Sequence, residues 1–581
     1  MSYLDRVNKK LRGEFNNQVR AVEADNHIVL EGALENWEDL VRAGLLSAPK
    51  GFAKRRFRGL VNRIRFTGAE IEPMEVPGPR DTVLEGQRPD VLIIGGGVIG
   101  CAIARELSRY KLDILLIEKE HDLAIHASSR NDGMVHPGLD LRRGTKKYHY
   151  TIWGNKMYER ITRELGVPFE RTGQYLCFGN PLLKPFLYLT LLYWKWMKVP
   201  GARVVGKREL HRLEPGLADD LCAALFFPSA GVVCPFDLTI AYGENAVLNG
   251  ARISLDTAAL DMRLEGGLVT GVGTNRGRVY PRVVVNAAGV FADTVAAMAG
   301  DQFYSIHPRK GTNSILDKKF TGIVARTITS RMGTSSKKSH TKGGGIIRTA
   351  HGNLLIGPDA VETWERENFA TNRSSIEAVF KKFEHTSPLL NQGQIIAYFT
   401  GIRAATYEED FVVCKGRKTA NLVHAAGIQS PGLTAAPAIG VDAARFAVEI
   451  LGGMTGKKPE PNENFDPVRE PIPRAAAMDD AERRALIAQN PDYGIILCRC
   501  EEVSRGEILD SLRRPVPCDT LDGVKRRIRP GSGRCQGSFC GPLILRLIAG
   551  EKGVPLEGVT KSGPGSPILR GPNKEVDGKY E

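Results

Sequence analysis

The sequence predicts an α/β protein, in which a parallel sheet with crossover helices is interrupted by a long insertion and a smaller domain lies at each end. Three observations predict this organisation. Residues 90–119 read as a strand, a glycine turn, a helix and a second strand. Residues 1–75 show the short helical and alternating patterns of a small α+β domain. Half of the ten cysteines lie in the last fifth of the 581 residues, which marks that region as separate.

The stretch around the first strand has the pattern G-x-G-x-x-G, with glycines at Gly95, Gly97 and Gly100. The first glycine allows a tight turn, the second lets the backbone approach a pyrophosphate, and the third lets the helix pack on the strand. Glu118 ends the second strand 23 residues after Gly95, where a carboxylate can bind a ribose hydroxyl. The stretch therefore predicts a dinucleotide site, and by itself it does not distinguish FAD from NAD.

The composition is that of a soluble globular protein, with 42% hydrophobic and 25% charged residues. The formal net charge of +14 favours anionic substrates, cofactors or partners. We expect no nucleic-acid partner, because the basic residues are spread along the chain without a nucleic-acid-binding motif. The charged first fifteen residues lack the apolar core of a signal peptide, so we expect a cytoplasmic protein.

One apolar run, residues 182–199, reads LLKPFLYLTLLYWKWMKV. Pro185 and the lysines Lys184, Lys195 and Lys198 interrupt it, so it is too broken to span a bilayer. We expect a helix packed on its own domain. An interfacial membrane helix, and with it peripheral membrane contact, is the alternative.

Changes in composition predict the domain boundaries. We expect a small domain at 1–75, a linker at 76–88, the main unit at 89–455, a second linker at 456–490, a cysteine-bearing domain at 491–555 and a tail at 556–581. The first domain, with IVLEGALEN and GLVNRIRF, resembles a BON domain. That resemblance implies a small docking module that contacts membranes or partners.

Four blocks of the main unit read VLIIGGGVIG, SSRNDGMVHPGL, VVVNAAGVFAD and GIQSPGLTAAPAIG. In this order they resemble the FAD-dependent oxidoreductases of the D-amino-acid oxidase superfamily, in particular the branch of glycerol-3-phosphate dehydrogenases and L-2-hydroxyglutarate oxidases. The resemblance implies a Rossmann-like FAD-binding domain with an inserted antiparallel-sheet substrate domain. It also implies the FAD-binding residues, which are Gly95, Gly97, Gly100, Glu118, Ser128, Ser129, Asn131, Ala288, Gly289, Gly432, Leu433 and Thr434.

Two further segments resemble substrate-binding parts of the same family. FTGIRAAT resembles the segment whose arginine grips the substrate anion, which indicates Arg403. An arginine suits this task because its planar fork binds a carboxylate or phosphate with two parallel hydrogen bonds. IHPRKGTN resembles a segment that borders the active site and makes His307, Arg309 and Lys310 second candidates. The basic stretch 328–345 could form an anion-binding lid, but a solvated loop is the preferred interpretation; its charged members are Arg331, Lys337, Lys338 and Lys342.

Four cysteines near the C-terminal end form two close pairs, C-x-C and C-x4-C, separated by 34 residues. They are Cys498, Cys500, Cys535 and Cys540. Two thiolate pairs can hold a 2Fe-2S cluster or a zinc ion, although structural zinc sites favour C-x2-C. The segment resembles the BFD-like 2Fe-2S domain, which implies a small mainly helical iron-sulfur domain, with zinc as the alternative. The other cysteines are expected to pack as small hydrophobes, and they are Cys101, Cys177, Cys222, Cys234, Cys414 and Cys518.

These observations lead to the hypothesis of a flavin dehydrogenase that oxidises the alcohol of a small anion. Glycerol 3-phosphate is the first substrate candidate, L-2-hydroxyglutarate the second and an amino or opine acid the third. Histidine is the natural base near neutral pH, and we rank His136, His307 and His351 in that order. A 2Fe-2S cluster relays single electrons, so we expect a redox partner protein or a quinone pathway as acceptor. A non-catalytic flavin and iron-sulfur protein for electron transfer or redox sensing is the alternative of another class.

Overall fold

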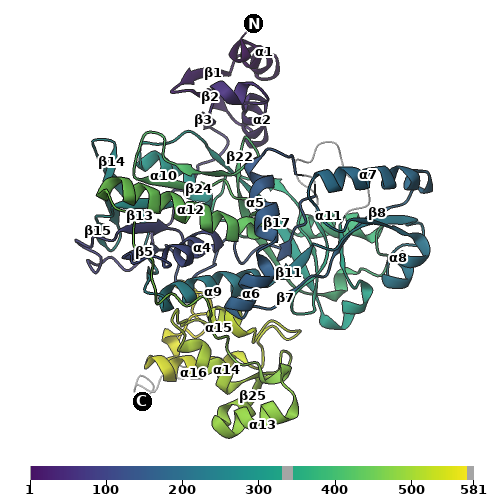
Figure 1. The fold of residues 1–581 in the computed structure, drawn as a ribbon. Helices are drawn as coiled ribbons and strands as arrows, with labels where there is room; N and C mark the ends of the chain where they lie inside the picture. The colour runs from purple at the N-terminus through teal and green to yellow at the C-terminus, as the bar shows by residue number, and fades with distance from the viewer. Residues whose placement is uncertain (1, 140, 330–343, 572–581) are drawn as a thin grey trace, which may run out of the picture. The chain divides into compact units, whose positions relative to one another are not determined.

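The computed structural model describes residues 2–139, 141–329 and 344–571 (Figure 1). Two compact units make up the chain. The first comprises Met1–Glu164 and Pro168–Phe465, and the second comprises Leu165–Val167 and Asp466–Glu581. The predicted basic loop, with Arg331, Lys337, Lys338 and Lys342, lies outside the described residues. Within the described ranges, none of the helices has the length and apolar character needed to cross a membrane.

The first unit contains the expected parallel sheet. Its six strands are, in spatial order, β12 (Arg252–Ser254), β5 (Ile114–Ile117), β4 (Val91–Ile94), β16 (Val283–Asn286), β24 (Leu422–Ala426) and β23 (Val412–Lys415). Neighbouring strands run parallel except β23, which pairs antiparallel at one edge. Every residue of β4 and β5 is buried, as expected of parallel strands covered on both faces.

Three helices pack beside one another on this sheet. The glycine turn after β4 leads into α4 (Val98–Leu107), which packs against α9 (Pro235–Leu248) and α12 (Gly432–Thr455). Gly440 of α12 lies directly on the backbone of Ala102, so the two helices touch where neither has a large side chain. This confirms the prediction of a strand, glycine turn and crossover helix from residues 90–119.

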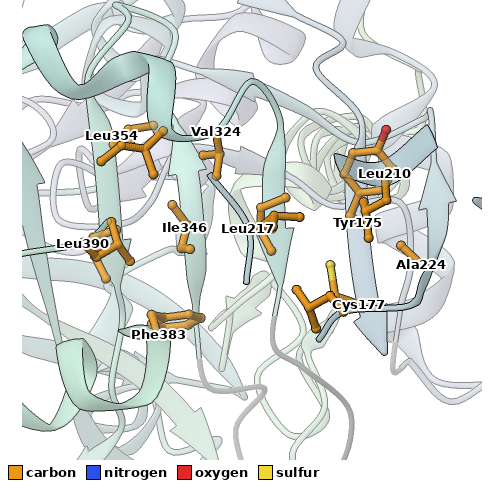
Figure 2. Packing of buried hydrophobic residues seen from close by; sticks show 14 of the residues in the cluster. Tyr175, Cys177, Leu210, Leu217, Ala224, Val324, Ile346, Leu354, Phe383 and Leu390 are labelled. Carbon is orange, nitrogen blue, oxygen red and sulfur yellow. The ribbon is translucent and has the colours of Figure 1, made fainter. Parts of the chain in front are cut away.

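The inserted substrate domain is built on a nine-stranded, mostly antiparallel sheet. Its strands are β21 (Val361–Glu362), β17 (Ile306–Leu316), β20 (Leu354–Gly357), β19 (Gly345–Arg348), β18 (Thr327–Thr329), β8 (Gln174–Phe178), β10 (Ala223–Phe227) and β9 (Arg203–Gly206), with β22 (Ile395–Thr406) paired to β17. The long β17–β22 pair places Arg309 opposite Arg403. Helices α8 (Lys207–Leu213) and α11 (Arg373–Glu384) contribute Leu210 and Phe383 to the apolar core of this domain (Figure 2).

Smaller elements complete the main body of the first unit. The strands are β6 (Met134–Val135), β7 (Phe169–Glu170), β11 (Gly231–Val233), β13 (Ala259–Glu265), β14 (Leu268–Thr274) and β15 (Gly277–Val279). The helices are α5 (Lys146–Asn155), α6 (Tyr158–Leu165), α7 (Lys184–Trp196) and α10 (Ala292–Met298). The first three strands form one small sheet and the last three another.

The N-terminal region folds as an α+β module with its own core. Its elements are α1 (Tyr3–Phe15), β1 (Val19–Ala24), β2 (His27–Leu34), α2 (Trp37–Ser47), α3 (Ala53–Arg56) and β3 (Leu60–Phe66). These helices and strands agree with the helical and alternating patterns of residues 1–75. The module packs on the substrate domain, because Tyr407 of the main body is part of its core and the Asn62 side chain donates to the Tyr407 hydroxyl at 2.8 Å.

The second unit is mainly helical, as expected. Its elements are α13 (Asp480–Gln489), β25 (Ile496–Cys498), β26 (Val503–Ser504), α14 (Arg505–Leu512), α15 (Leu521–Ile528) and α16 (Gly541–Lys552). Helix α13 lies inside the stretch that we expected to be a linker. It forms there because Asp479 and Glu482 cap its first turn reciprocally.

Candidate functional site

A cavity of about 1220 Å³ lies in the first unit. It extends from the glycine turn after β4 to the β17–β22 pair and is lined by residues from all four sequence blocks. The predicted residues on its wall are Gly95, Gly97, Glu118, Ser128, Asn131, His136, Ala288, Gly289, Arg403, Gly432 and Leu433. Gly100, Ser129, Thr434, His307 and His351 are not among its lining residues in the described ranges.

The glycine turn leaves no room for side chains. Gly95 has a φ of 114°, and a Cβ there would come within 2.5 Å of the Ala287 carbonyl oxygen. A Cβ on Gly100 would overlap the Gly95 carbonyl oxygen, so this glycine lets helix and turn pack closely, as predicted. Gly97 starts α4 without a side-chain cap, and Val98 N donates to Ser128 Oγ at 2.9 Å. The helix start and the bare turn suit the phosphates of a dinucleotide.

Glu118 lies at the end of β5, beside this turn. Its Oε2 accepts a hydrogen bond from Gly96 N at 2.5 Å, and its Oε1 accepts one from Glu120 N at 2.9 Å. Burial raises the pKa of the Glu118 carboxyl, and the two backbone donors oppose that shift. The backbone thus fixes the orientation of a carboxyl group at the position where a ribose is expected.

The block after Glu118 is held together by its own polar side chains. Asn131 donates to the Ala127 and Ser128 carbonyls at 3.0 Å, and Ser129 Oγ donates to the Ile125 carbonyl at 3.2 Å. The His136 backbone N donates to Thr434 Oγ1 at 2.9 Å. Ser129 and Thr434 therefore shape the backbone around the cavity, whereas His136 and Asn131 also line it.

Arg403 lies on β22 and reaches the opposite side of the cavity. Its Nη2 donates to the Asp359 carbonyl at 2.9 Å, and its Nη1 is buried without a hydrogen-bond partner among the residues that the structure describes. Burial lowers the pKa of Arg403, and the charge of Arg309 lowers it further. A buried guanidinium that faces a cavity with a nitrogen unsatisfied fits an anionic ligand.

Arg309, opposite Arg403 in the strand register, has a different environment. Its Nε donates to Glu362 at 2.5 Å and its Nη2 donates to Glu409 at 2.8 Å. His307 shares Glu362 through Nδ1 at 2.9 Å and stacks on the Tyr407 ring at 4.6 Å. Both side chains belong to a buried network beside the N-terminal module, so these second candidates are not at the cavity wall.

The remaining candidates are also away from the cavity wall. Lys310 pairs with Glu365 at 3.1 Å. His351 lies in the turn between β19 and β20. Of the three ranked histidines, His136 is the one that the structure brings to the cavity in the described part of the chain.

The structure adds cavity residues that the sequence patterns did not indicate. Lys147 of α5 lines the cavity, and burial lowers its pKa. Glu408 lines it too; burial raises the pKa of its carboxyl to about 7, and its Oε1 has no hydrogen-bond partner among the described residues. Lys50 and Lys54 reach the same cavity from the N-terminal module. Only the position of Glu408, five residues after Arg403, could have drawn attention to it.

Beside the cavity, one group of side chains has spacing that could suit a metal ion. One ligand atom each of Glu120, His126 and Glu367 lie within 4.8 Å of one another. The Lys119 ammonium contacts both carboxylates, at 2.6 Å from Glu120. Because this ammonium already occupies the position between the two carboxylates, we assign no metal there.

The four candidate cysteine ligands form two pairs in the second unit. Cys500 Sγ lies 3.5 Å from Cys535 Sγ, and Cys498 hydrogen-bonds Cys540. That hydrogen bond lowers the pKa of Cys498 to about 6, aided by the backbone amides of Gly531, Glu501 and Cys500. A tetrahedral zinc site would bring all four sulfurs within ~4 Å of one another. Among the described residues, however, no three of them meet within 4.8 Å. Two separate pairs suit the two irons of a 2Fe-2S cluster.

The surroundings of these thiols differ from pair to pair. Cys498 and Cys540 are buried in the domain core, whereas Cys500 is exposed. Helix α16 starts directly after Cys540 with proline in its first turn, so its N-terminal dipole can stabilise negative charge on the thiolate. Cys518 is buried in the same core near the Ser511 carbonyl, which agrees with a packing role.

Comparison with known proteins identifies both units. The FAD dependent oxidoreductase family model matches residues 90–445, and the BFD-like [2Fe-2S] binding domain model matches residues 496–550. A glycerol 3-phosphate dehydrogenase of Caloramator mitchellensis is 36% identical over 491 residues, covering 84% of this chain and 99% of that protein. One of the subunits of the anaerobic glycerol-3-phosphate dehydrogenase of Escherichia coli K12 is 24% identical, covering 78% and 87%.

A solved structure agrees with the fold of the first unit. The dithionite-reduced L-alpha-glycerophosphate oxidase of Mycoplasma pneumoniae, with FAD bound, aligns with a TM-score of 0.59 at 26% identity over 66% of this chain and 98% of that one. The glycine turn, the helix start and the carboxyl at the strand end fit FAD, and the paired thiols fit a cluster. The chain is therefore an FAD-dependent oxidoreductase of this family, with FAD in the first unit and a 2Fe-2S cluster in its BFD-like domain.

Proposed function

We propose that the protein is a dehydrogenase that oxidises the secondary alcohol of glycerol 3-phosphate. The observation that carries this proposal is Arg403, which lines the cavity that also contains the glycine turn and whose buried Nη1 has no hydrogen-bond partner among the described residues. It supports a small anionic substrate close to the FAD site. The relatives named above for glycerol 3-phosphate support the choice of this anion.

Three positive side chains prepare the cavity for a phosphate. In the described part of the chain Arg403 Nη1 has no partner, while the hydrogen bond of Nη2 to the Asp359 carbonyl holds the guanidinium in place. Lys147 lines the same cavity, and a bound phosphate would favour its charged form over the neutral form that burial favours. Lys54 adds charge from the N-terminal module.

The reaction removes two electrons and two protons from the alcohol. When bound, FAD would be held by the glycine turn after β4 and by Glu118, and it would supply the hydride acceptor for the carbon that carries the hydroxyl group. His136 accepts the hydroxyl proton, since it lines the cavity and its backbone is fixed by Thr434 Oγ1 and by the Asn155 side chain at 2.9 Å. Arg403 holds the phosphate and so orients the carbon.

A 2Fe-2S cluster held by Cys498, Cys500, Cys535 and Cys540 would supply transfer of single electrons to a partner protein or a quinone pathway. The exposed Cys500 supports this role, because a cluster ligand at the surface allows close approach of an acceptor. Quinones reside in membranes, so the proposal includes peripheral contact with a membrane.

Anaerobic reduction of the bound flavin tests the proposal. Glycerol 3-phosphate should bleach the flavin absorbance, and L-2-hydroxyglutarate and an opine should do so more slowly or not at all. If an alternative compound bleaches it faster, the substrate assignment is wrong. If none does, the non-catalytic electron-transfer hypothesis replaces it.

Replacement of Arg403 distinguishes a loss of substrate binding from a loss of FAD. We expect Arg403→Ala to lower kcat/KM by about 10²-fold or more, since a charge-assisted hydrogen bond to the substrate anion is lost, while FAD content stays the same. Arg403→Lys is the matched control: it keeps the charge without the fork and should recover part of the loss. An Arg403→Ala enzyme with unchanged kcat/KM would contradict the anion-binding role.

A further inference from the structure

One helix of the substrate domain carries large apolar side chains on its outside. Helix α7 and the turn before it, Pro181–Leu183, together span 16 residues. The exposed side chains, with their exposed fractions, are Leu182 (84%), Phe186 (59%), Tyr188 (55%), Leu189 (65%), Leu192 (71%), Tyr193 (47%) and Trp196 (55%). We refer to these seven residues as the α7 face. A soluble helix normally places polar and charged groups on its outer side.

The inner side of α7 accounts for its attachment to the domain. Leu187 and Trp194, two turns apart, are buried, and Leu191 between them packs on the same cluster. This cluster also contains Leu139 and Leu141, which line the substrate cavity. The expected packing of the helix on its own domain is therefore found on the buried side of α7. It does not explain the α7 face.

The surroundings of the α7 face are positive. Lys184, Lys195 and Lys198 are exposed around it, and the Arg143 guanidinium lies 4.6 Å from the centre of the Trp196 ring. No aspartate or glutamate occurs in the sequence between Glu170 and Glu209. A contiguous apolar patch with a basic rim is the composition of helices that lie in a membrane interface.

We propose that α7 docks the protein onto an anionic lipid surface. Phe186, Leu189 and Leu192 enter the boundary between headgroups and acyl chains, and the Trp196 and tyrosine rings lie at headgroup level. The lysines of the rim attract the negative headgroups. The inference deepens the membrane contact proposed above for a quinone acceptor and rests on that part of it.

The charge around the α7 face favours a lipid surface over a second copy of the chain as its binding partner. Two α7 faces brought together would oppose their basic rims, and like charges in close contact repel. Anionic headgroups instead complement both the apolar face and its rim. Docking there would also bring a wall of the substrate cavity, through Leu139 and Leu141, towards the lipid phase.

Vesicle binding of the full-length FAD-loaded protein tests the proposal. We expect co-sedimentation with vesicles of phosphatidylcholine and phosphatidylglycerol, and weaker binding to phosphatidylcholine alone. The double variant Leu189→Gln with Leu192→Gln should lower the partition coefficient by about tenfold or more, because two inserted apolar side chains become polar. Lys195→Gln with Lys198→Gln should weaken binding to the anionic vesicles alone and make it less sensitive to salt.

The matched control is Leu264→Gln with Leu389→Gln, since both leucines are exposed on other segments. It should bind vesicles as the unaltered protein does. The proposal is overturned if the unaltered protein stays in the supernatant when anionic vesicles sediment, or if the control loses as much binding as the α7 variant. It is also overturned if light scattering shows a dimer that the α7 variant dissociates. Flavin reduction by glycerol 3-phosphate without vesicles is measured separately, so failure of the substrate proposal is distinguishable from failure of docking.

Discussion

The flavin cavity and the cysteine site are assembled in opposite ways. The cavity collects residues from Leu45 to Leu433 of the first unit, on both sheets and on the N-terminal module. The four thiols come from two short segments of one small domain, 498–500 and 535–540. A site made from distant segments depends on the whole unit, whereas a site made from two local pairs depends on little beyond its own residues.

The largest effect should come from a local change at the cysteine site. We expect Cys535→Ala to abolish the 2Fe-2S cluster, because one iron loses a thiolate ligand. Electron transfer to the natural acceptor should then stop, while glycerol 3-phosphate still bleaches the flavin. Iron analysis and the reduced-state EPR signal measure the first effect, and stopped-flow absorbance measures the second.

Cys518→Ala is the matched control for this experiment, since Cys518 is buried in the same core without a place in either thiol pair. It should keep its iron. Stoichiometric zinc without iron in the unaltered protein would refute the cluster assignment.

A change in the buried network beside the flavin cavity should affect stability more than chemistry. Arg309→Ala leaves Glu362 and Glu409 without their buried partner, and removal of one member of a buried ion pair costs about 3–5 kcal/mol of unfolding free energy. Urea unfolding followed by flavin fluorescence measures the loss, and the iron content of the second unit should not change.

Arg373→Ala provides the comparison, because the Arg373 side chain is 91% exposed and its ion pair with Glu377 lies within one helix. It should change the free energy of unfolding by less than about 0.5 kcal/mol. Equal effects of the two substitutions on the free energy of unfolding would show that the buried network around Arg309 does not stabilise the first unit.

The smallest expected effect is a pH dependence at Glu408. Burial raises the pKa of this carboxyl from its ordinary value near 4.5 to about 7, so the folded protein binds the proton more tightly than the unfolded chain. The resulting stability is fully present below pH 4.5 and is lost as the pH rises through about 7. Glu408→Gln, which stays neutral, should raise the free energy of unfolding at pH 8 by up to about 3 kcal/mol and change it little at pH 5.

Unfolding curves at both pH values check this expectation. Glu72→Gln is the control, because Glu72 is exposed. Its free energy of unfolding relative to the unaltered protein should be the same at pH 5 and at pH 8. A Glu408→Gln variant whose stability relative to the unaltered protein does not depend on pH would contradict the burial argument.

Two arginines show where sequence reasoning reaches its limit. Arg309 and Arg403 both lie in blocks that resemble substrate-binding segments, and the strand register places them opposite each other. Glu362 and Glu409 bind Arg309, whereas Arg403 keeps a donor for the cavity. The motifs ranked Arg403 first, but the carboxylates that immobilise Arg309 could not be assigned to it before the fold was known.

The sequence by itself determined the features that depend on local geometry. The glycine turn of residues 95–100, the strand that ends at Glu118 and the two cysteine pairs are short-range patterns, because steric fit and ligand spacing act between near neighbours. Only the tertiary structure decided which histidine reaches the cavity, that the N-terminal module supplies Lys50 and Lys54 to its wall, and that α7 keeps an apolar face outside. These features depend on contacts between distant segments, and burial at such contacts follows from packing that no single stretch of sequence contains.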